Sequence, residues 1–291
     1  MKIGAVYPQY ELGGDPAAVA AFGVGAERMG FDHLVCYDHV VGSPPDRVPP
    51  LTGPYTHEHP FHDPFVLFAY LAGLTERIEF VTGVLVLPQR QTVLVARQAA
   101  DIQLLSGGRL RLGVAPGWNW VEYAALGQEF TTRGTRMAEQ IRLLRRLWTG
   151  EIVDFEGSFD RVDGAALNPP PAWPIPIWIG GSSSRALKRA ARLAEGFIFH
   201  GPRESWEPLA EQLRTALREE GRDVEGFGFE LIARGPGAGS VVDAIEAWAE
   251  AGGTHAAVTT MLSGLPADVG AHTDMLAEVR QELDARGLWS S

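Results

Sequence analysis

Two adjacent polar residues, Asp38 and His39, directly follow a short apolar run and are the first candidates for acid–base chemistry. A histidine exchanges a proton near neutral pH, and a neighbouring carboxylate sets its tautomer or stabilises its charge. The pair therefore predicts a catalytic His39 assisted by Asp38. A strand-end histidine that makes only ordinary hydrogen bonds is the alternative that this pattern leaves open.

A glycine- and serine-rich turn, Gly180-Gly181-Ser182-Ser183, joins an apolar run to a helix-forming stretch. Glycines let the backbone approach a ligand closely, and the start of a helix offers free amides and the positive end of a dipole. The turn predicts a phosphate cradle, although it lacks the Gly-Lys-Ser/Thr of a Walker loop. Serine is also a favoured helix N-cap, so capping alone is the other interpretation.

A third feature is Gly83-Val84, inside the most apolar run of the chain. A glycine within a strand marks a bulge or a close approach of the backbone, where a flat apolar ligand can pack. A plain core strand is the competing interpretation.

Other chemistries have little support in the sequence. His57, His59 and His62 are close together in a proline-rich segment, but their spacing matches no familiar set of metal ligands, so no metal site is predicted. The single cysteine, Cys36, lies within an apolar run. No Gly-x-Ser-x-Gly elbow and no dinucleotide glycine fingerprint follows a strand, so neither nucleophilic hydrolysis nor nicotinamide-domain chemistry is predicted.

The amino-acid composition limits the class of protein to which the chain can belong. The chain has 291 residues, 45% of them hydrophobic, and a net charge of -11. The acidic balance argues against nucleic acid or an anionic membrane as the main partner. Because the N-terminus lacks a basic start and a long apolar stretch, it does not resemble a signal peptide, and no apolar run is long enough to span a bilayer. These features predict a cytoplasmic globular protein.

The elements that position these residues alternate regularly. Eight strand-like runs are each followed by a helical stretch, which predicts parallel pairing and favours a closed (β/α)8 barrel in one domain, residues 1–291, over an open doubly wound sheet. An insertion at 150–174 separates the fourth helix from the fifth strand. The runs are 3–7, 33–37, 78–87, 109–115, 175–179, 196–200, 227–233 and 255–261, and the helices are 17–29, 64–73, 92–105, 135–148, 183–193, 206–220, 241–251 and 274–286.

Several motifs, in order along most of the chain, resemble the luciferase-like monooxygenase superfamily, and most closely its branch that uses the deazaflavin coenzyme F420. The resemblance implies a TIM barrel of the bacterial luciferase-like type with an insertion between helix 4 and strand 5. The motifs are TGVLVLPQRQ at 82–91, ARQAADIQLLSGG at 96–108, RLRLGVAPGW at 109–118, EYAALG at 122–127, LLRRLW at 143–148 and PIWIGGSSSRALKRAARLAEGF at 176–197.

The same resemblance implies roles for individual residues. The Gly83–Val84 bond falls where the family has a non-prolyl cis peptide behind the coenzyme ring, and the cradle falls where the family binds the coenzyme phosphate. Asp38 and His39 match an Asp-His pair near the reacting carbon of the ring. Trp118 replaces a glutamate of the deazaflavin sugar-phosphate dehydrogenases, and Pro116 replaces an arginine that assists flavin binding in bacterial luciferase.

These implications predict an F420-dependent oxidoreductase that moves a hydride between the deazaflavin ring and a small organic substrate. Two alternatives remain open: a monooxygenase that uses reduced FMN and oxygen, and a barrel that binds cofactor without turnover or has lost it. We expect Trp118, Phe65 and Trp178 to wall the substrate pocket, and the loop 41–62 to act as a lid. A homodimer is expected from the relatives, and the scarcity of lysine, present only at Lys2 and Lys188, fits an actinobacterial source.

Overall fold

The computed structural model describes residues 1–291 except 52, 290 and 291. Its parallel strands follow the order β3-β2-β1-β11-β10-β9-β8-β5-β4, and pairing of β3 with β5 closes the sheet into a barrel. The predicted eight-stranded barrel is confirmed, with β3 and β4 forming one interrupted strand. The strands are β1 (Lys2–Val6), β2 (His33–Cys36), β3 (Glu79–Thr82), β4 (Leu85–Val86), β5 (Leu110–Ala115), β8 (Ile177–Gly180), β9 (Gly196–His200), β10 (Gly228–Ala233) and β11 (His255–Thr259).

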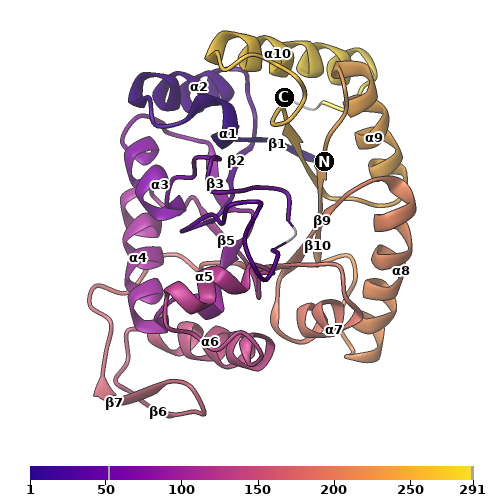
Figure 1. Ribbon diagram of the computed structural model, residues 1–291. Helices are drawn as coiled ribbons and strands as arrows, with labels where there is room; N and C mark the ends of the chain where they lie inside the picture. The colour runs from indigo at the N-terminus through magenta and orange to yellow at the C-terminus, as the bar shows by residue number, and fades with distance from the viewer. Residues whose placement is uncertain (52, 290–291) are drawn as a thin grey trace.

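The helices form a ring around the barrel (Figure 1). Two of them begin where the sequence places Asp-Pro: the Asp15 side chain accepts a hydrogen bond from the Ala17 amide, and Asp63 accepts one from the Phe65 amide. Proline at the first helical position needs no hydrogen-bond partner for its nitrogen, which favours these starts. The ring consists of α2 (Pro16–Arg28), α3 (Pro64–Ala72), α4 (Thr92–Leu105), α6 (Arg133–Leu147), α7 (Ser184–Leu193), α8 (Arg203–Glu219), α9 (Ala238–Glu250) and α10 (Val269–Ala285).

Smaller elements lie in the connections. The predicted insertion is present and contains an antiparallel hairpin, which projects at the lower left of Figure 1. The stretch after β5 contains a short helix. These additional elements are α1 (Gln9–Leu12), the 3-10 helix η1 (Leu87–Gln89), α5 (Trp120–Ala125), β6 (Val153–Glu156) and β7 (Arg161–Ala165).

The barrel interior is filled by side chains, chiefly small branched ones around Trp178. Two glycines make room for its ring, because a Cβ would lie 2.3 Å from the indole at Gly196 and 2.1 Å from it at Gly228. The larger core lies between the strands and the surrounding helices. Among the described helices, none is long and apolar enough to cross a membrane.

Candidate active site

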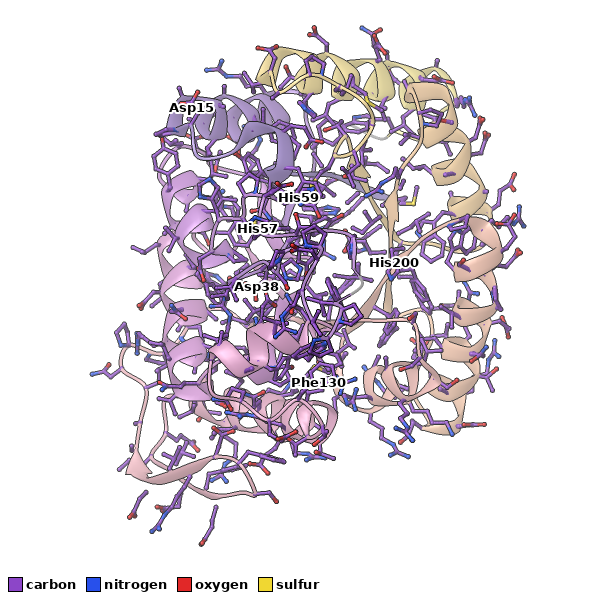
Figure 2. The ribbon with its side chains drawn as sticks, in the orientation of Figure 1. Asp15, Asp38, His57, His59, Phe130 and His200 are labelled. Atoms are coloured by element: carbon purple, nitrogen blue, oxygen red, sulfur yellow. The ribbon has the colours of Figure 1, made fainter. Side chains whose placement is uncertain are left out.

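A cavity of about 1280 Å³ opens at the carboxyl ends of the strands, the end where barrel enzymes carry their active sites. Its walls come from turns that follow β2, β4, β5, β8, β9 and β10, so segments far apart in sequence share one space. In Figure 2, Asp38 and His200 lie on either side of this mouth. The predicted residues on its wall are Asp38, His39, Gly83, Val84, Trp118, Gly180, Gly181, Ser182 and Ser183.

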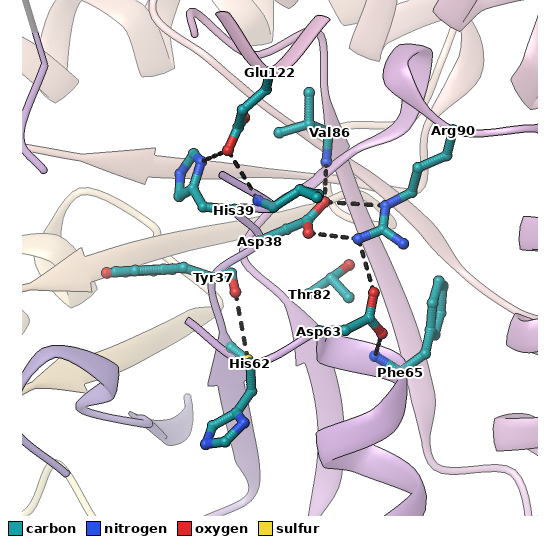
Figure 3. Close-up of polar contacts among 12 residues, drawn as sticks. Tyr37, Asp38, His39, His62, Asp63, Phe65, Thr82, Val86, Arg90 and Glu122 are labelled. Atoms are coloured by element: carbon teal, nitrogen blue, oxygen red, sulfur yellow. Dashed lines mark hydrogen bonds and ion pairs between the residues drawn. The ribbon is translucent and has the colours of Figure 1, made fainter. Parts of the chain in front are cut away.

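His39 is held by a carboxylate that the sequence did not single out. Its Nδ1 lies 3.1 Å from Oε1 of Glu122, which is buried at the start of α5 (Figure 3). The same oxygen accepts hydrogen bonds from the Val40 amide at 2.9 Å and the Val41 amide at 3.4 Å. In the tautomer with the proton on Nδ1, the ring donates to this carboxylate, and Nε2 of the neutral imidazole carries the free lone pair.

Local structure fixes Glu122 in this position. The Asn119 side chain caps α5 by accepting hydrogen bonds from the Val121 amide at 3.0 Å and the Glu122 amide at 3.3 Å. The Tyr55 hydroxyl, from the loop 41–62, also contacts His39 Nδ1. Asn119, three residues before Glu122, is an N-cap signal, but nothing local to either segment indicates that α5 lies against the residues that follow β2.

The expectation that Asp38 assists His39 is wrong. Asp38 is buried, and its Oδ1 lies 2.6 Å from Arg90 Nη2, while its Oδ2 accepts a hydrogen bond from the Val86 amide at 2.9 Å (Figure 3). Arg90 Nη2 also lies 2.9 Å from Asp63 Oδ2. Burial and these two carboxylates act on the guanidinium in opposite directions, and the carboxylates hold the pKa of Arg90 above its usual range. The Asp38 side chain therefore links the end of β2 to β4, and Glu122 is the carboxylate that contacts His39.

Gly83 and Val84 form the interruption between β3 and β4, and the peptide bond between them is cis, as the resemblance implies. Val84 reaches across to the cradle, since a Cβ added to Gly180 would lie 2.8 Å from Val84 Cγ1. The Thr82 hydroxyl donates to the Gly113 carbonyl at 2.6 Å and anchors the end of β3. The kinked strand thus presents Val84 as an apolar wall of the cavity.

The cradle lies where β8 meets α7. Gly181 has φ of +142°, a conformation that favours glycine, and a Cβ there would lie 3.1 Å from Ala186 Cβ. Ser183 caps α7, its hydroxyl oxygen accepting a hydrogen bond from the Ala186 amide at 3.3 Å. The capping interpretation of Ser183 is therefore confirmed. The positive end of the α7 dipole adjoins the cavity wall, which suits an anionic group.

Only one of the three aromatic residues expected in the substrate pocket lines it. The Trp118 ring lies 5.1 Å from Tyr55 and 6.3 Å from His39, between ring centres. The prediction for Phe65 is wrong, because α3 directs its side chain into the core, where it is 4% exposed. The prediction for Trp178 is also wrong. Its side chain points toward the opposite end of the barrel, and its ring centre lies 4.9 Å from that of His255.

The loop 41–62 supplies pocket residues that sequence reasoning missed. It crosses the front of the barrel in Figure 1 and places Tyr55 and Phe61 on the cavity wall, with their rings 5.0 Å apart. Tyr10, after β1, also lines the cavity. Aromatic residues in a proline-rich loop were a visible signal, but which of them face inward depends on the folded path of the loop.

Two of the three clustered histidines have separate hydrogen-bond partners. His59 Nδ1 accepts a hydrogen bond from the Thr56 amide at 2.9 Å, and His62 Nε2 donates to the Gly13 carbonyl at 2.9 Å. Among the described residues, no group of three or more His, Cys, Asp or Glu side chains is placed to hold a metal ion.

Comparisons with known proteins agree on one family for this chain. Residues 3–289 match the family model described as luciferase-like monooxygenase. An uncharacterised protein of Mycobacterium tuberculosis is 36% identical over 221 residues, 75% of each chain. An F420-dependent glucose-6-phosphate dehydrogenase of Gordonia bronchialis is 32% identical over 228 residues, which cover 76% of this chain and 63% of that protein.

Solved structures agree in fold. The monooxygenase RslO1 of Streptomyces bottropensis has a TM-score of 0.79 at 19% identity, covering 99% of this chain and 100% of the other. The coenzyme F420-dependent tetrahydromethanopterin reductase of Methanopyrus kandleri has a TM-score of 0.78 at 16% identity, covering 98% and 99%. At these identities the likeness shows the fold.

Proposed function

Because the chain belongs to the luciferase-like monooxygenase family, we propose that it is a coenzyme F420-dependent oxidoreductase acting on a small organic substrate. The relatives include both deazaflavin-dependent oxidoreductases and flavin-dependent monooxygenases. The observation that supports the deazaflavin proposal is the buried Glu122 carboxylate on Nδ1 of His39, because His39 lines the same cavity as the cradle. Hydride transfer between the coenzyme and a substrate carbon leaves one substrate proton to be transferred. We expect His39, oriented by Glu122, to transfer it.

The coenzyme fits the residues present. Gly180 and Gly181 leave open backbone where a side chain would collide with Val84 or Ala186. The start of α7, with the neighbouring Ser182 hydroxyl, would hold the coenzyme phosphate, and Val84 would support the ring. When bound, the deazaflavin supplies the hydride chemistry, and the protein supplies binding, orientation and electrostatics.

His39 has the role of moving the proton at its Nε2. With Nδ1 donating to Glu122, the neutral ring accepts a proton at Nε2, and the protonated ring is stabilised by the carboxylate. In the direction that oxidises an alcohol, Nε2 takes the hydroxyl proton; in the reverse direction it returns a proton to the carbonyl oxygen. Glu122 fixes the orientation of the imidazole, and the backbone amides of Val40 and Val41 hold the Glu122 carboxylate in place.

The substrate side of the cavity is aromatic. Trp118, Tyr55 and Phe61 pack around His39, and the Phe61 and His39 ring centres are 4.8 Å apart. Trp118 stands where the resemblance places a glutamate in the sugar-phosphate dehydrogenases. We therefore infer that the substrate differs from a sugar phosphate, and that the loop 41–62 excludes water from the reacting atoms.

Difference spectra test the coenzyme assignment. The purified protein is titrated separately with oxidised F420 and with FMN, and binding is followed through the absorption of each ring. We expect saturable binding of F420, and much weaker binding of FMN. Tight binding of FMN with none of F420 would support the reduced-flavin monooxygenase instead, and binding of neither by folded protein would contradict both.

A homodimer remains a prediction. Light scattering coupled to size exclusion distinguishes it, since a dimer has twice the chain mass of 31.6 kDa.

A further inference from the structure

The floor of the active-site cavity is a layer of residues above the packed interior of the barrel. Side chains along a strand alternate between its two faces, so the residue two positions after an interior one also faces the barrel axis. The interior layer includes Val35, Ile232 and Ala257. Two positions after most members of that layer come the residues of the cavity floor, which are Tyr37, Gly83, Gly180, His200, Arg234 and Thr259.

The cavity floor has two chemically different halves. Glycines form the half beside the kinked strand and the cradle, where the coenzyme is proposed to lie. Arg234, Thr259 and Tyr37 form the other half, at the ends of β10, β11 and β2. Arg234 is next to Thr259, because Ala233 of β10 pairs with Val258 of β11. The proposed reaction gives this polar half no role.

The arginines on the described wall of the cavity differ in what holds them. Arg203 Nη2 lies 2.7 Å from Glu207 Oε1. Arg133 lies over the Phe130 ring and donates to the Phe130 carbonyl at 2.9 Å. Arg234 is exposed at the cavity, and within the described part of the chain no ion pair or hydrogen bond holds its guanidinium. Its donors are therefore available to a ligand.

No free carboxylate on the described wall opposes the charge of Arg234. Asp38, the acidic residue there, is buried and paired with Arg90. The cavity is thus positive at Arg234, although the whole chain has a net charge of -11. A cleft lined by one sign of charge concentrates ligands of the opposite sign.

Two tyrosines show that Arg234 acts on the interior of the cavity. Burial raises the pKa of Tyr37 to about 12, and the positive charge of Arg234 acts against this rise. Burial also raises the pKa of Tyr10, and Arg234 again acts in the opposite direction. Both tyrosines line the cavity, and both hydroxyls stay protonated near neutral pH. They can donate hydrogen bonds to an anion bound beside Arg234.

We propose that Arg234 binds the carboxylate of an organic acid that is the substrate, with the hydroxyls of Tyr37 and Tyr10 as further donors. The identification of this acid as the substrate rests on the proposed function. One free guanidinium matches a singly charged carboxylate, which it binds through two parallel hydrogen bonds. The carboxylate does not react, and it anchors one end of the molecule.

Aromatic residues on the wall connect this anchor to His39. The Tyr10 and Phe61 ring centres are 5.4 Å apart, and those of Phe61 and His39 are 4.8 Å apart. An acid held at Arg234 lies along these rings, with its other end toward Nε2 of His39. The cavity of about 1280 Å³ has room for it beside the coenzyme, because a single-ligand site occupies roughly 300–1,000 Å³. The substrate class is an organic acid with an apolar or aromatic body.

Binding of a matched acid and amide tests the site without coenzyme. Phenylacetate and phenylacetamide share a ring and differ in charge, and each is titrated into the full-length protein at constant ionic strength in a calorimeter. We expect phenylacetate to bind at least ~10-fold more tightly, because hydrogen bonds to a charged group are stronger than those between neutral groups. Equal affinities would overturn the proposal.

Three variants locate the preference for the acid. Arg234→Gln should remove it, and Arg234→Lys should restore part of it, because lysine keeps the charge without the two-donor edge. Both variants should fold, since no described partner of Arg234 is left unpaired, and circular dichroism checks this. Arg203→Gln is the matched control, because Arg203 is already paired with Glu207. Loss of the preference in Arg203→Gln with its retention in Arg234→Gln would contradict the site.

Two further measurements separate this site from the anionic groups of the coenzyme. Gly181→Val obstructs the cradle, so the preference for phenylacetate should persist, and its loss would place the acid in the cradle. The Kd for F420 should be the same in Arg234→Gln as in the wild type. A higher Kd for F420 with an unchanged preference for phenylacetate would assign Arg234 to the coenzyme and contradict the proposal.

The acid site and the coenzyme assignment fail separately. A protein that binds no F420 but prefers phenylacetate through Arg234 retains the acid site and contradicts the coenzyme assignment. A protein that binds F420 and shows no preference for the acid contradicts the acid site alone.

Discussion

Glu122 Oε1 lies 3.1 Å from Nδ1 of His39, although the two residues are 83 positions apart in the chain. The contact joins the end of β2 to the start of α5, and the same carboxylate oxygen is held by the amides of Val40 and Val41. His39 is thereby fixed in orientation by a group that never needs to contact the substrate. In the proposed reaction Glu122 is therefore a positioning residue, and His39 is the residue that would move the proton.

Removing the charge of Glu122 should impair turnover while leaving coenzyme binding nearly unchanged. Glu122→Gln keeps an oxygen for the Val40 amide but no longer stabilises a protonated His39, so we expect kcat to fall by roughly 10²-fold. His39→Ala should lower kcat by roughly 10²–10⁴-fold. Steady-state kinetics with F420, measured across pH, check both variants.

The double variant distinguishes a shared role from two separate ones. If Glu122 acts through His39, adding Glu122→Gln to His39→Ala should cause little further loss of kcat. Losses that multiply would show that Glu122 works independently of the histidine.

The cradle can be tested by filling it. Gly181→Val places a branched side chain at a positive φ and against Ala186, so we expect the Kd for F420 to rise at least ~10-fold. Gly14→Ala is the matched control, because a Cβ at Gly14 meets no atom within 4 Å. Fluorescence or absorption titration measures both Kd values. Wild-type affinity in Gly181→Val would place the phosphate elsewhere.

The Asp38–Arg90 pair should stabilise the folded protein. Arg90→Met leaves the buried Asp38 carboxylate with the Val86 amide as its main partner, and breaking a buried pair in this way costs about 3–5 kcal/mol of unfolding free energy. Arg97→Met breaks a partly exposed pair with Asp101 and should cost less than about 1 kcal/mol. Chemical denaturation of both variants provides the comparison; equal losses would contradict a structural role for Asp38.

The barrel interior should make stability depend on pH. The pKa of His255 is about 3, against 6.5 for an ordinary histidine, because burial and Arg111 disfavour its charged form. The unfolded chain therefore takes up this proton first. The stability contributed by a neutral His255 is complete above pH 6.5 and is lost as the pH falls from 6.5 toward 3, by at most about 1.4 kcal/mol per pH unit.

His255→Gln isolates this contribution. As the pH falls from 6.5 to 4.5, the unfolding free energy of the variant should decrease less steeply than that of the wild type. The two slopes should differ by up to the uptake of one proton on unfolding. His272, whose pKa is also lowered chiefly by burial, is present in both proteins and cancels in the comparison. Denaturation curves in phosphate-free buffer measure the slopes, and identical slopes would show that His255 does not titrate on unfolding.

The alternation of elements was readable from the sequence because it depends on local patterns. Apolar runs that are buried on both faces predicted every barrel strand, and the Asp-Pro starts at Asp15 and Asp63 predicted helices that the structure confirms. The geometry of the turn at 180–183 was readable for the same reason, since the positive φ of Gly181 and the Ser183 cap depend only on the local chain and the first turn of α7. Local chemistry is enough to place such features at a strand end.

What the sequence by itself determined is therefore the barrel, the glycine- and serine-rich turn at the start of α7, and the position of His39 at the mouth. Only the tertiary structure decided which carboxylate reaches His39, that Asp38 is bound by Arg90, and that Phe65 and Trp178 point away from the pocket. The physical reason is that partner choice depends on how α5, β4 and the loop 41–62 cross in space. The spacing of residues along the chain does not show how these segments cross.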